Sequence, residues 1–158
     1  MQPMINMALR LARTGSEKAI LASARLDRLK IVSSDPFDFS SSMDYEINEL
    51  IVSGLQKAYP THTIKSRVGE SIIGLDTEPS WFVDPLFGSL NFFKGNPSYG
   101  VSVAIEIERE IKHSVSILPE YNQEFVASKG SGAQLNKTKC RVDSQAKLES
   151  SLLGVCLG

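Results

Sequence analysis

WFVDPLFGSLNFFKG, residues 81–95, is the most informative stretch of the sequence. Its first three residues are large and apolar and predict a buried strand that ends at Asp84. Pro85 has no N–H for a strand ladder and is expected to stop it, while Gly88 and Ser89 suit a turn into a helix. A carboxylate at a strand end, followed by free N–H groups at a helix start, can hold a metal and a phosphate. From spacing alone, however, the pattern favours a strand, a Pro-Gly turn and one surface Asp.

The order of residues in this stretch resembles the signature of the inositol monophosphatase family, W-x-[IV]-D-P-[LI]-D-G-T-[TS]-N-F, especially that of its bacterial SuhB-like members. Ser89 conservatively replaces the Thr of the signature, and the matching residues are Trp81, Asp84, Pro85, Leu86, Gly88, Asn91 and Phe92. The second Asp of the signature is Phe87 here. The family consists of Mg²⁺-dependent phosphomonoesterases in which that Asp binds metal. The resemblance therefore implies the fold and argues against the activity at the same position.

The overall composition is that of a globular protein. A chain of 158 residues, 42% hydrophobic and 22% charged, suits one domain with a substantial core. The formal charge of −1 gives no electrostatic case for nucleic acid or an anionic membrane as a partner. Two cysteines are too few for a disulfide framework, and we expect both to be reduced. We predict a cytoplasmic protein, because no apolar run approaches the roughly 20 residues of a membrane span and the N-terminus lacks a signal-peptide pattern.

Two amphipathic helices are predicted in the first third of the chain. Apolar residues at helical spacing indicate the first over residues 3–24, where Gly15 suggests either close packing or a break. The second is predicted to begin after the cap candidates Ser41–Ser42 and to end at Pro60. The Ser-rich segment between them, residues 25–42, is expected to be a loop or a mobile flap.

Strands are predicted from Thr63 onward. The alternation of apolar and polar residues places them near 63–67, 81–84, 98–107, 112–118 and 123–128. A hairpin turn is expected at residues 108–110 and a Gly-rich turn at 130–136. Two helices followed by an antiparallel sheet give an α+β layered domain.

The family resemblance extends over nearly the whole chain. It includes the opening MQPMINMALRLA, the segment DFSSSMDYEINELIVSGLQKAYPTHTI and the turn GSGAQLN. It implies that residues 1–150 form the N-terminal α+β domain, half of the family's layered sandwich. Residues 151–158 would then be the start of a strand that leads to a second domain, which carries a W-D-x-A-A-G motif in the family.

The resemblance also implies site residues. Asp84 and the carbonyl of Leu86 fall on positions that bind metal in the family, and Gly88 and Ser89 fall on the turn that binds phosphate. Asp44 and Ser89 correspond to the acid and the hydroxyl that activate the attacking water. Because other family ligands are replaced, we expect these positions to be vestigial.

Three replacements weaken the expected magnesium site. Phe87 stands at the second signature Asp, and without gaps the family's Glu-Glu pair falls on Arg67 and Val68; Glu70 could substitute only if the loop shifts by three residues. Two unit charges about 4 Å apart interact with an energy of about 4 kcal/mol at an effective dielectric of 20. A guanidinium in place of a carboxylate therefore turns a large attraction for a dication into a repulsion. Mg²⁺ also demands near-octahedral oxygen ligands. We therefore expect weak or no Mg²⁺ binding and little catalysis.

The two histidines show no metal-ligand spacing. His62 follows the end of the second predicted helix and is expected to be a capping or surface residue, and His113 is expected to be exposed on a strand. Phe92 and Phe93 are expected in the core, although a pair of Phe on an uncovered face would suit a partner.

Three functional hypotheses follow. The first is a family member with a degenerate site that acts through a protein partner; the family commonly dimerises, and SuhB-like members are associated with transcription complexes containing RNA polymerase. The second is a Mg²⁺-dependent phosphatase of inositol monophosphate or a similar small ester, with the missing Asp supplied by another chain. The third is a truncated product without its own function. Since a missing domain would leave an apolar face uncovered, we also predict a homo-oligomer or poor solubility.

Overall fold

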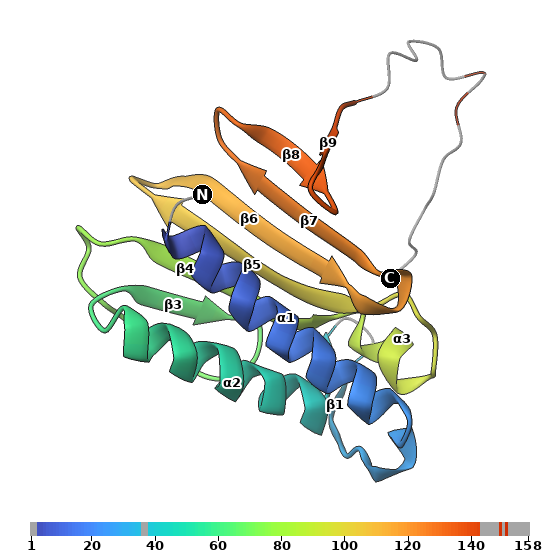
Figure 1. Cartoon of the computed structure of the whole chain (residues 1–158). Helices are drawn as coiled ribbons and strands as arrows, with labels where there is room; N and C mark the ends of the chain where they lie inside the picture. The colour runs from blue at the N-terminus through green and yellow to red at the C-terminus, as the bar shows by residue number, and fades with distance from the viewer. Residues whose placement is uncertain (1–2, 36–37, 143–148, 150, 152–158) are drawn as a thin grey trace.

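Two long helices lie side by side on one face of a large sheet (Figure 1) in this computed structural model, which describes residues 3–35, 38–142, 149 and 151. The helices are α1 (Pro3–Ser23) and α2 (Ser42–Ala58). Three short helices accompany them: η1 (Leu26–Arg28), α3 (Ser89–Phe93) and η2 (Pro119–Tyr121). The strands are β1 (Ile31–Asp35), β2 (Asp38–Ser41), β3 (Thr63–Ser66), β4 (Ser80–Phe87), β5 (Gly100–Ile107), β6 (Glu110–Leu118), β7 (Gln123–Ser128), β8 (Gly132–Leu135) and β9 (Thr138–Cys140).

The large sheet has the order β3-β4-β5-β6-β7-β8-β9. Neighbouring strands in this sheet are antiparallel, except that β3 and β4 run parallel. These two strands are joined through the segment that follows Arg67. The predicted α+β architecture, with helices packed on a mostly antiparallel sheet, is confirmed. Among the described residues, no helix has the length and apolar character needed to span a membrane.

The core lies between the two long helices and strands β3–β6. Trp81 and the valines of the central strands are almost completely buried there, together with Ile47, Ile51 and Leu55 of α2. Because side chains alternate along a strand, the neighbours of these valines point to the opposite face of the sheet. This alternation gives the sheet one face that is covered by α1 and α2 and one that is not (Figure 1).

Gly15 marks a close approach of the two helices and no break, since α1 is continuous over 21 residues. A Cβ added at Gly15 would lie 2.8 Å from Cγ2 of Ile47, and one added at Gly54 would lie 2.6 Å from Cδ2 of Leu11. The helices can pack this closely because neither glycine carries a side chain.

The predicted flap at 25–42 is ordered differently from the expectation. It contains η1 and an antiparallel hairpin of β1 and β2. Phe39 of β2 packs against Phe93 of α3, with ring centroids 5.4 Å apart. The Ser-rich segment gave no strand signal, because it has little apolar alternation. The hairpin depends instead on its backbone pairing and on the contact between Phe39 and Phe93.

Two further boundaries differ from the predictions. Strand β4 continues through Pro85 to Phe87, because the register with β5 shifts between Asp84 and Phe87 and Pro85 needs no ladder bond there. The Gly-rich turn is shorter than predicted, since β8 already begins at Gly132. The hairpin turn at 108–110 is confirmed by the positive φ of Glu108 and Arg109. The strand predicted at 151–158 lies outside the described residues, apart from Ser151.

Candidate functional site

The predicted site residues come together where four elements meet. Strand β4 brings Asp84 and Leu86, α3 begins with Ser89, and α2 brings Asp44 in its first turn. Arg67 follows directly after β3, and its backbone N–H donates to the carbonyl of Val83 at 3.0 Å. The residues expected to bind metal, to bind phosphate and to activate water are therefore neighbours in the structure.

The guanidinium of Arg67 lies at the centre of this group. Its Nε donates to Oδ1 of Asp84 at 2.9 Å. Its Nη2 donates to the carbonyl of Leu86 at 3.1 Å, to Oγ of Ser89 at 2.9 Å and to Oδ1 of Asp44. One cationic side chain thus contacts every expected metal or catalytic position: the two carboxylates, the carbonyl and the hydroxyl. We call this set, with Arg67, the Arg67 cluster.

The carboxylates around Arg67 favour its ionised state against the effect of burial. Asp44 is fully buried, while the side chains of Arg67 and Asp84 are 27% and 32% exposed. Burial alone lowers the pKa of the Arg67 guanidinium, but hydrogen bonds and charges from Asp84 and Asp44 outweigh it and raise that pKa above its usual value. Arg67 is therefore a permanent cation at this place.

Asp44 has a second role at the start of α2. Its Oδ2 accepts hydrogen bonds from the backbone N–H of Ser41 at 2.8 Å and from the Ser41 hydroxyl at 3.0 Å. This is the acidic half of a capping box, and it confirms the predicted helix start. The carboxylate is fixed by the helix cap on one side and by Arg67 on the other.

The turn before α3 is formed by Gly88 and Ser89. Gly88 has φ +70°, and a Cβ there would lie 2.5 Å from the carbonyl oxygen of Ser98, so glycine is required for both conformation and space. The Ser89 hydroxyl is within hydrogen-bond distance of the Leu86 carbonyl at 2.6 Å and also contacts Asp44. These contacts hold the Ser89 hydroxyl inside the Arg67 cluster.

The other expected positions are placed as follows. Val68 is buried, and Glu70, the alternative acid, is exposed. The ring of Phe87 lies against Gly100 of β5, where an added Cβ would be 2.5 Å from Cζ of Phe87.

Sequence reasoning missed Asp38 of the β1–β2 hairpin, whose Oδ1 lies 3.6 Å from Nη1 of Arg67. Only the pairing of the hairpin shows this proximity.

The expectations for both histidines are wrong. His62 and His113 are each 7% exposed. Nδ1 of His62 accepts a hydrogen bond from Nε1 of Trp81 at 3.0 Å, and Nδ1 of His113 lies 2.9 Å from Oγ of Ser128. Partners from neighbouring strands make their burial tolerable, and a single sequence gives no signal for such partners. Phe92 is buried as predicted, while Phe93 is half-buried.

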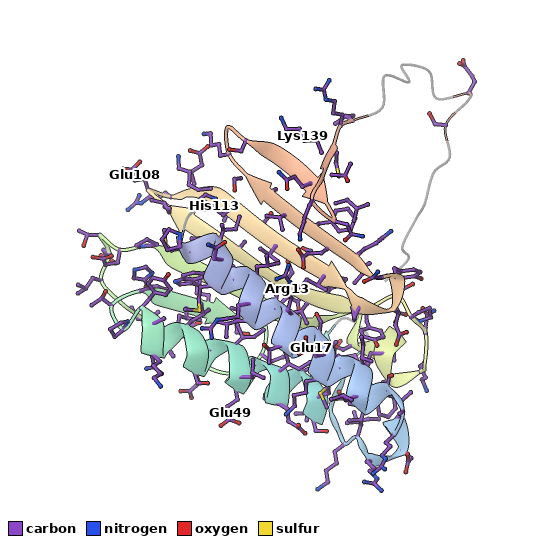
Figure 2. All side chains as sticks on the ribbon, viewed as in Figure 1. Arg13, Glu17, Glu49, Glu108, His113 and Lys139 are labelled. Carbon is purple, nitrogen blue, oxygen red and sulfur yellow. The ribbon has the colours of Figure 1, made fainter. Side chains whose placement is uncertain are left out.

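The described residues contain no group of three or more His, Cys, Asp or Glu arranged to hold a metal ion. The Arg67 cluster is rich in oxygen atoms, but these atoms already face the guanidinium donors. Figure 2 shows the side chains of the described residues, including His113 on the sheet and Arg13 on α1, which forms an ion pair with Glu124.

Comparison with known proteins identifies the family. The model of the inositol monophosphatase family matches residues 1–158. The chain is 39% identical over 156 residues to the Nus factor SuhB of Pseudomonas aeruginosa, covering 98% of this chain and 58% of that protein. It is 31% identical over 153 residues to the Nus factor SuhB of Escherichia coli, covering 97% and 57%.

The solved structures agree. The extragenic suppressor protein suhB from Bartonella henselae superposes with a TM-score of 0.87 at 30% identity, covering 91% of this chain and 56% of that one. The IMPase of Thermotoga maritima gives a TM-score of 0.83 at 27% identity, covering 94% and 57%. The chain thus spans less than two thirds of the length of these relatives. It belongs to the inositol monophosphatase family, is SuhB-like, and corresponds to the N-terminal half of the family fold.

Proposed function

We propose that this chain is a non-catalytic, SuhB-like member of the inositol monophosphatase family that acts through protein contacts. The observation that carries the proposal is the position of the Arg67 guanidinium. It contacts Asp44, Asp84, the Leu86 carbonyl and Ser89, which are the positions where the family resemblance implies metal and catalysis. In this proposal the guanidinium takes the place of the metal and makes the residues vestigial.

Electrostatics supports this assignment. A guanidinium supplies a fixed positive charge and several directed N–H donors to the carboxylates. The carboxylates therefore have a cationic partner without a bound metal ion. A Mg²⁺ ion placed beside it would meet a like charge and would have to displace hydrogen bonds from its own ligands. Without the ion there is no activated water and no clamp on the leaving oxygen. Residues held by Arg67 can still order the turn and the helix start.

The names of the relatives indicate the kind of partner. The proteins of P. aeruginosa and E. coli are both called Nus factor SuhB. We propose that this chain likewise binds a protein of the transcription machinery, and that it forms a homo-oligomer. The sheet face opposite α1 and α2 supports association, because half-buried side chains of several strands lie there.

A second candidate function is a Mg²⁺-dependent phosphomonoesterase acting on inositol monophosphate or a similar small ester. It is favoured by the retained oxygen groups of Asp44, Asp84, Leu86 and Ser89. It requires that Arg67 leaves the cluster and that another chain supplies the missing acid.

Phosphate release and Mg²⁺ binding separate these functions. We expect no EDTA-sensitive release of phosphate from inositol 1-phosphate and no calorimetric Mg²⁺ binding by the purified chain. The double variant Arg67→Glu/Phe87→Asp restores acids at two of the three replaced positions and is expected to gain Mg²⁺ binding. The control Arg10→Glu, which makes the same arginine-to-glutamate change on the exposed side of α1, should not. EDTA-sensitive turnover by the unaltered chain would contradict the proposal and support the second candidate.

A further inference from the structure

A cavity of about 430 Å³ lies between α1 and one end of the large sheet. Its helix wall consists of residues that recur every three or four positions and so share one face of α1: Arg13, Ser16, Glu17 and Ile20. Its sheet wall comes from the end of β6, the start of β7 and the β8–β9 turn: Ile117, Pro119, Asn122, Gln123, Glu124, Asn136 and Lys137. Figure 2 labels Arg13 and Glu17 on the helix. The volume falls within the range of small-molecule sites, about 300–1,000 Å³.

The two walls of this cavity are held in place by hydrogen bonds. Nε and Nη2 of Arg13 donate to Oε2 and Oε1 of Glu124 at 2.7 and 2.8 Å, which ties the helix to β7. Oδ1 of Asn136 accepts from the backbone N–H of Glu124 at 2.9 Å, and Nδ2 of Asn136 donates to the carbonyl of Asn122 at 2.9 Å. The cavity is therefore preformed, and a ligand would not have to order its walls.

The hydroxyl of Ser16 is the buried polar group of the helix wall. Ser16 is 3% exposed, and its Oγ has no hydrogen-bond partner among the described residues. The hydroxyls of Thr14 and Ser23 on the same helix instead donate to the backbone carbonyls of Arg10 and Ile20, at 3.1 and 2.8 Å. A buried hydroxyl without a partner costs free energy. Because Ser16 lines the cavity, a molecule bound there is placed to make the hydrogen bond that no protein group makes.

The remaining lining indicates the chemistry of that molecule. The charged residues of the walls are two bases and two acids, so their formal charges cancel and a ligand of either sign gains no net attraction. A hydroxyl both donates and accepts, and so do the side-chain amides of Asn122 and Gln123. Ile117 and Pro119 add apolar surface. The lining therefore fits an uncharged molecule with an aliphatic part and a group that both donates and accepts hydrogen bonds.

We propose that this cavity is a binding site for a small neutral molecule of that kind, such as an aliphatic amide, and that the Ser16 hydroxyl hydrogen-bonds its polar group. The site goes beyond the proposed function, since it uses none of the residues of the Arg67 cluster and involves neither metal nor phosphate. Its test is therefore independent of the tests for Mg²⁺ binding and phosphate release.

The ligand class is tested by a protein-observed NMR titration with two probes of the same skeleton. N-acetylleucinamide is neutral, with an isobutyl group between two amides, while N-acetylleucine carries a carboxylate at pH 7. We expect N-acetylleucinamide to shift the backbone amide signals of Glu17, Gln123 and Lys137 saturably, with a dissociation constant of about a millimolar for a molecule of this size. N-acetylleucine should bind several-fold more weakly, because its carboxylate loses hydration without gaining a net opposite charge. Equal or tighter binding of N-acetylleucine, or no saturable shift of these amides, would overturn the proposal.

The role of Ser16 is tested by Ser16→Ala, with Ser53→Ala as the matched control. Ser53 is exposed on α2 and donates to the carbonyl of Leu50 at 3.3 Å, so the control makes the same change within a helix but far from a buried unpaired hydroxyl. Ser16→Ala should weaken N-acetylleucinamide binding roughly two- to ten-fold, and Ser53→Ala should not change it.

The melting temperature without ligand separates this role from a structural one. Ser16→Ala should raise it at least as much as Ser53→Ala, because it removes a buried hydroxyl that has no partner in the protein. A lower melting temperature in Ser16→Ala would mean that the hydroxyl serves the fold. That result, or an unchanged affinity of Ser16→Ala for N-acetylleucinamide, would contradict the assignment of Ser16 to a ligand site.

Discussion

At the scale of single residues, Arg67 contacts side chains from four separate parts of the chain. Asp44 belongs to α2, Asp84 to β4, Ser89 to α3 and Asp38 to the β1–β2 hairpin. A charge-assisted hydrogen bond is stronger than a neutral one, and several from one side chain fix the relative positions of the elements. Arg67 therefore has a structural role whatever the chain binds.

Removal of this guanidinium should destabilise the fold strongly. In Arg67→Met the buried Asp44 loses its cationic partner while the methionine retains much of the side-chain volume. We expect a loss of roughly 2–4 kcal/mol in urea unfolding, somewhat below the ~3–5 of a fully buried pair because Arg67 is partly solvated. The matched control is Arg13→Met, which breaks the 2.7 Å ion pair with Glu124 at a site where Arg13 is 48% exposed. It should cost about 1 kcal/mol or less, and equal losses would contradict the special role of Arg67.

The sequence identified the members of this site but not their arrangement. Asp84, Leu86, Gly88, Ser89 and Asp44 could be named from the family resemblance, and all of them meet as expected. The resemblance also placed Arg67 at this site, on a position of the family's Glu-Glu pair. It did not supply the contacts of the guanidinium with both carboxylates, the Leu86 carbonyl and the Ser89 hydroxyl, which depend on the path of the chain after β3. The error at His62 has the same origin, because its acceptor role depends on a donor 19 positions away on another strand.

At the scale of elements, the packing of α1 on α2 depends on two glycines. The helical period predicted both helices, and Gly15 indicated close packing as one of two alternatives. The structure selects it because Gly15 faces Ile47 and Gly54 faces Leu11. The hairpin at β1 and β2 could not be predicted in the same way, since its Ser-rich strands carry little apolar alternation and depend on the contact of Phe39 with Phe93.

Gly15→Val should force the helices apart. The added Cβ would lie 2.8 Å from Cγ2 of Ile47, and the valine methyl groups need still more space, so we expect a loss of about 1–3 kcal/mol in thermal or urea unfolding. Thr14→Val introduces the same side chain at the adjacent, exposed position of α1. It should change stability by about 0.5 kcal/mol or less. Because valine has a higher helix propensity than glycine, the expected loss opposes the propensity change and reports the contact with α2. Unchanged stability in Gly15→Val, or an equal loss in Thr14→Val, would contradict the close-packing argument.

At the scale of the whole molecule, the proposed replacement of metal by Arg67 predicts a stability that is independent of magnesium. A ligand that binds the folded state raises its stability by RT ln(1 + [L]/Kd), and one that does not bind leaves it unchanged. We therefore expect the melting temperature to be the same with excess Mg²⁺ and with EDTA. The Arg67→Glu/Phe87→Asp variant should instead gain stability with Mg²⁺. A magnesium-dependent rise in the unaltered chain would be incompatible with a guanidinium that fills the cation position.

The uncovered sheet face predicts association of the whole molecule. A row of side chains in direct register crosses it, with Phe82, Ala104, Ser114, Ala127, Ala133 and Cys140 on successive strands from β4 to β9. All six are half-buried, uncharged and mostly small. Small residues leave a flat surface, and uncharged residues lose little on desolvation when another layer packs against them. A charge borders the row at Lys65 of β3, whose Nζ lies 5.4 Å from the centroid of the Phe82 ring.

Sedimentation velocity over a range of concentrations tests this surface. We expect the unaltered chain to form dimers or larger species as its concentration rises. Ala127→Arg places a long cation in the middle of the row and should return the chain to a monomer, because a second copy would have to bury that charge unpaired. Gln56→Arg introduces the same residue on the exposed side of α2 and should leave association unchanged. If the unaltered chain stays monomeric at every concentration, or if Ala127→Arg associates as strongly as Gln56→Arg, the sheet face is not where copies of this chain meet.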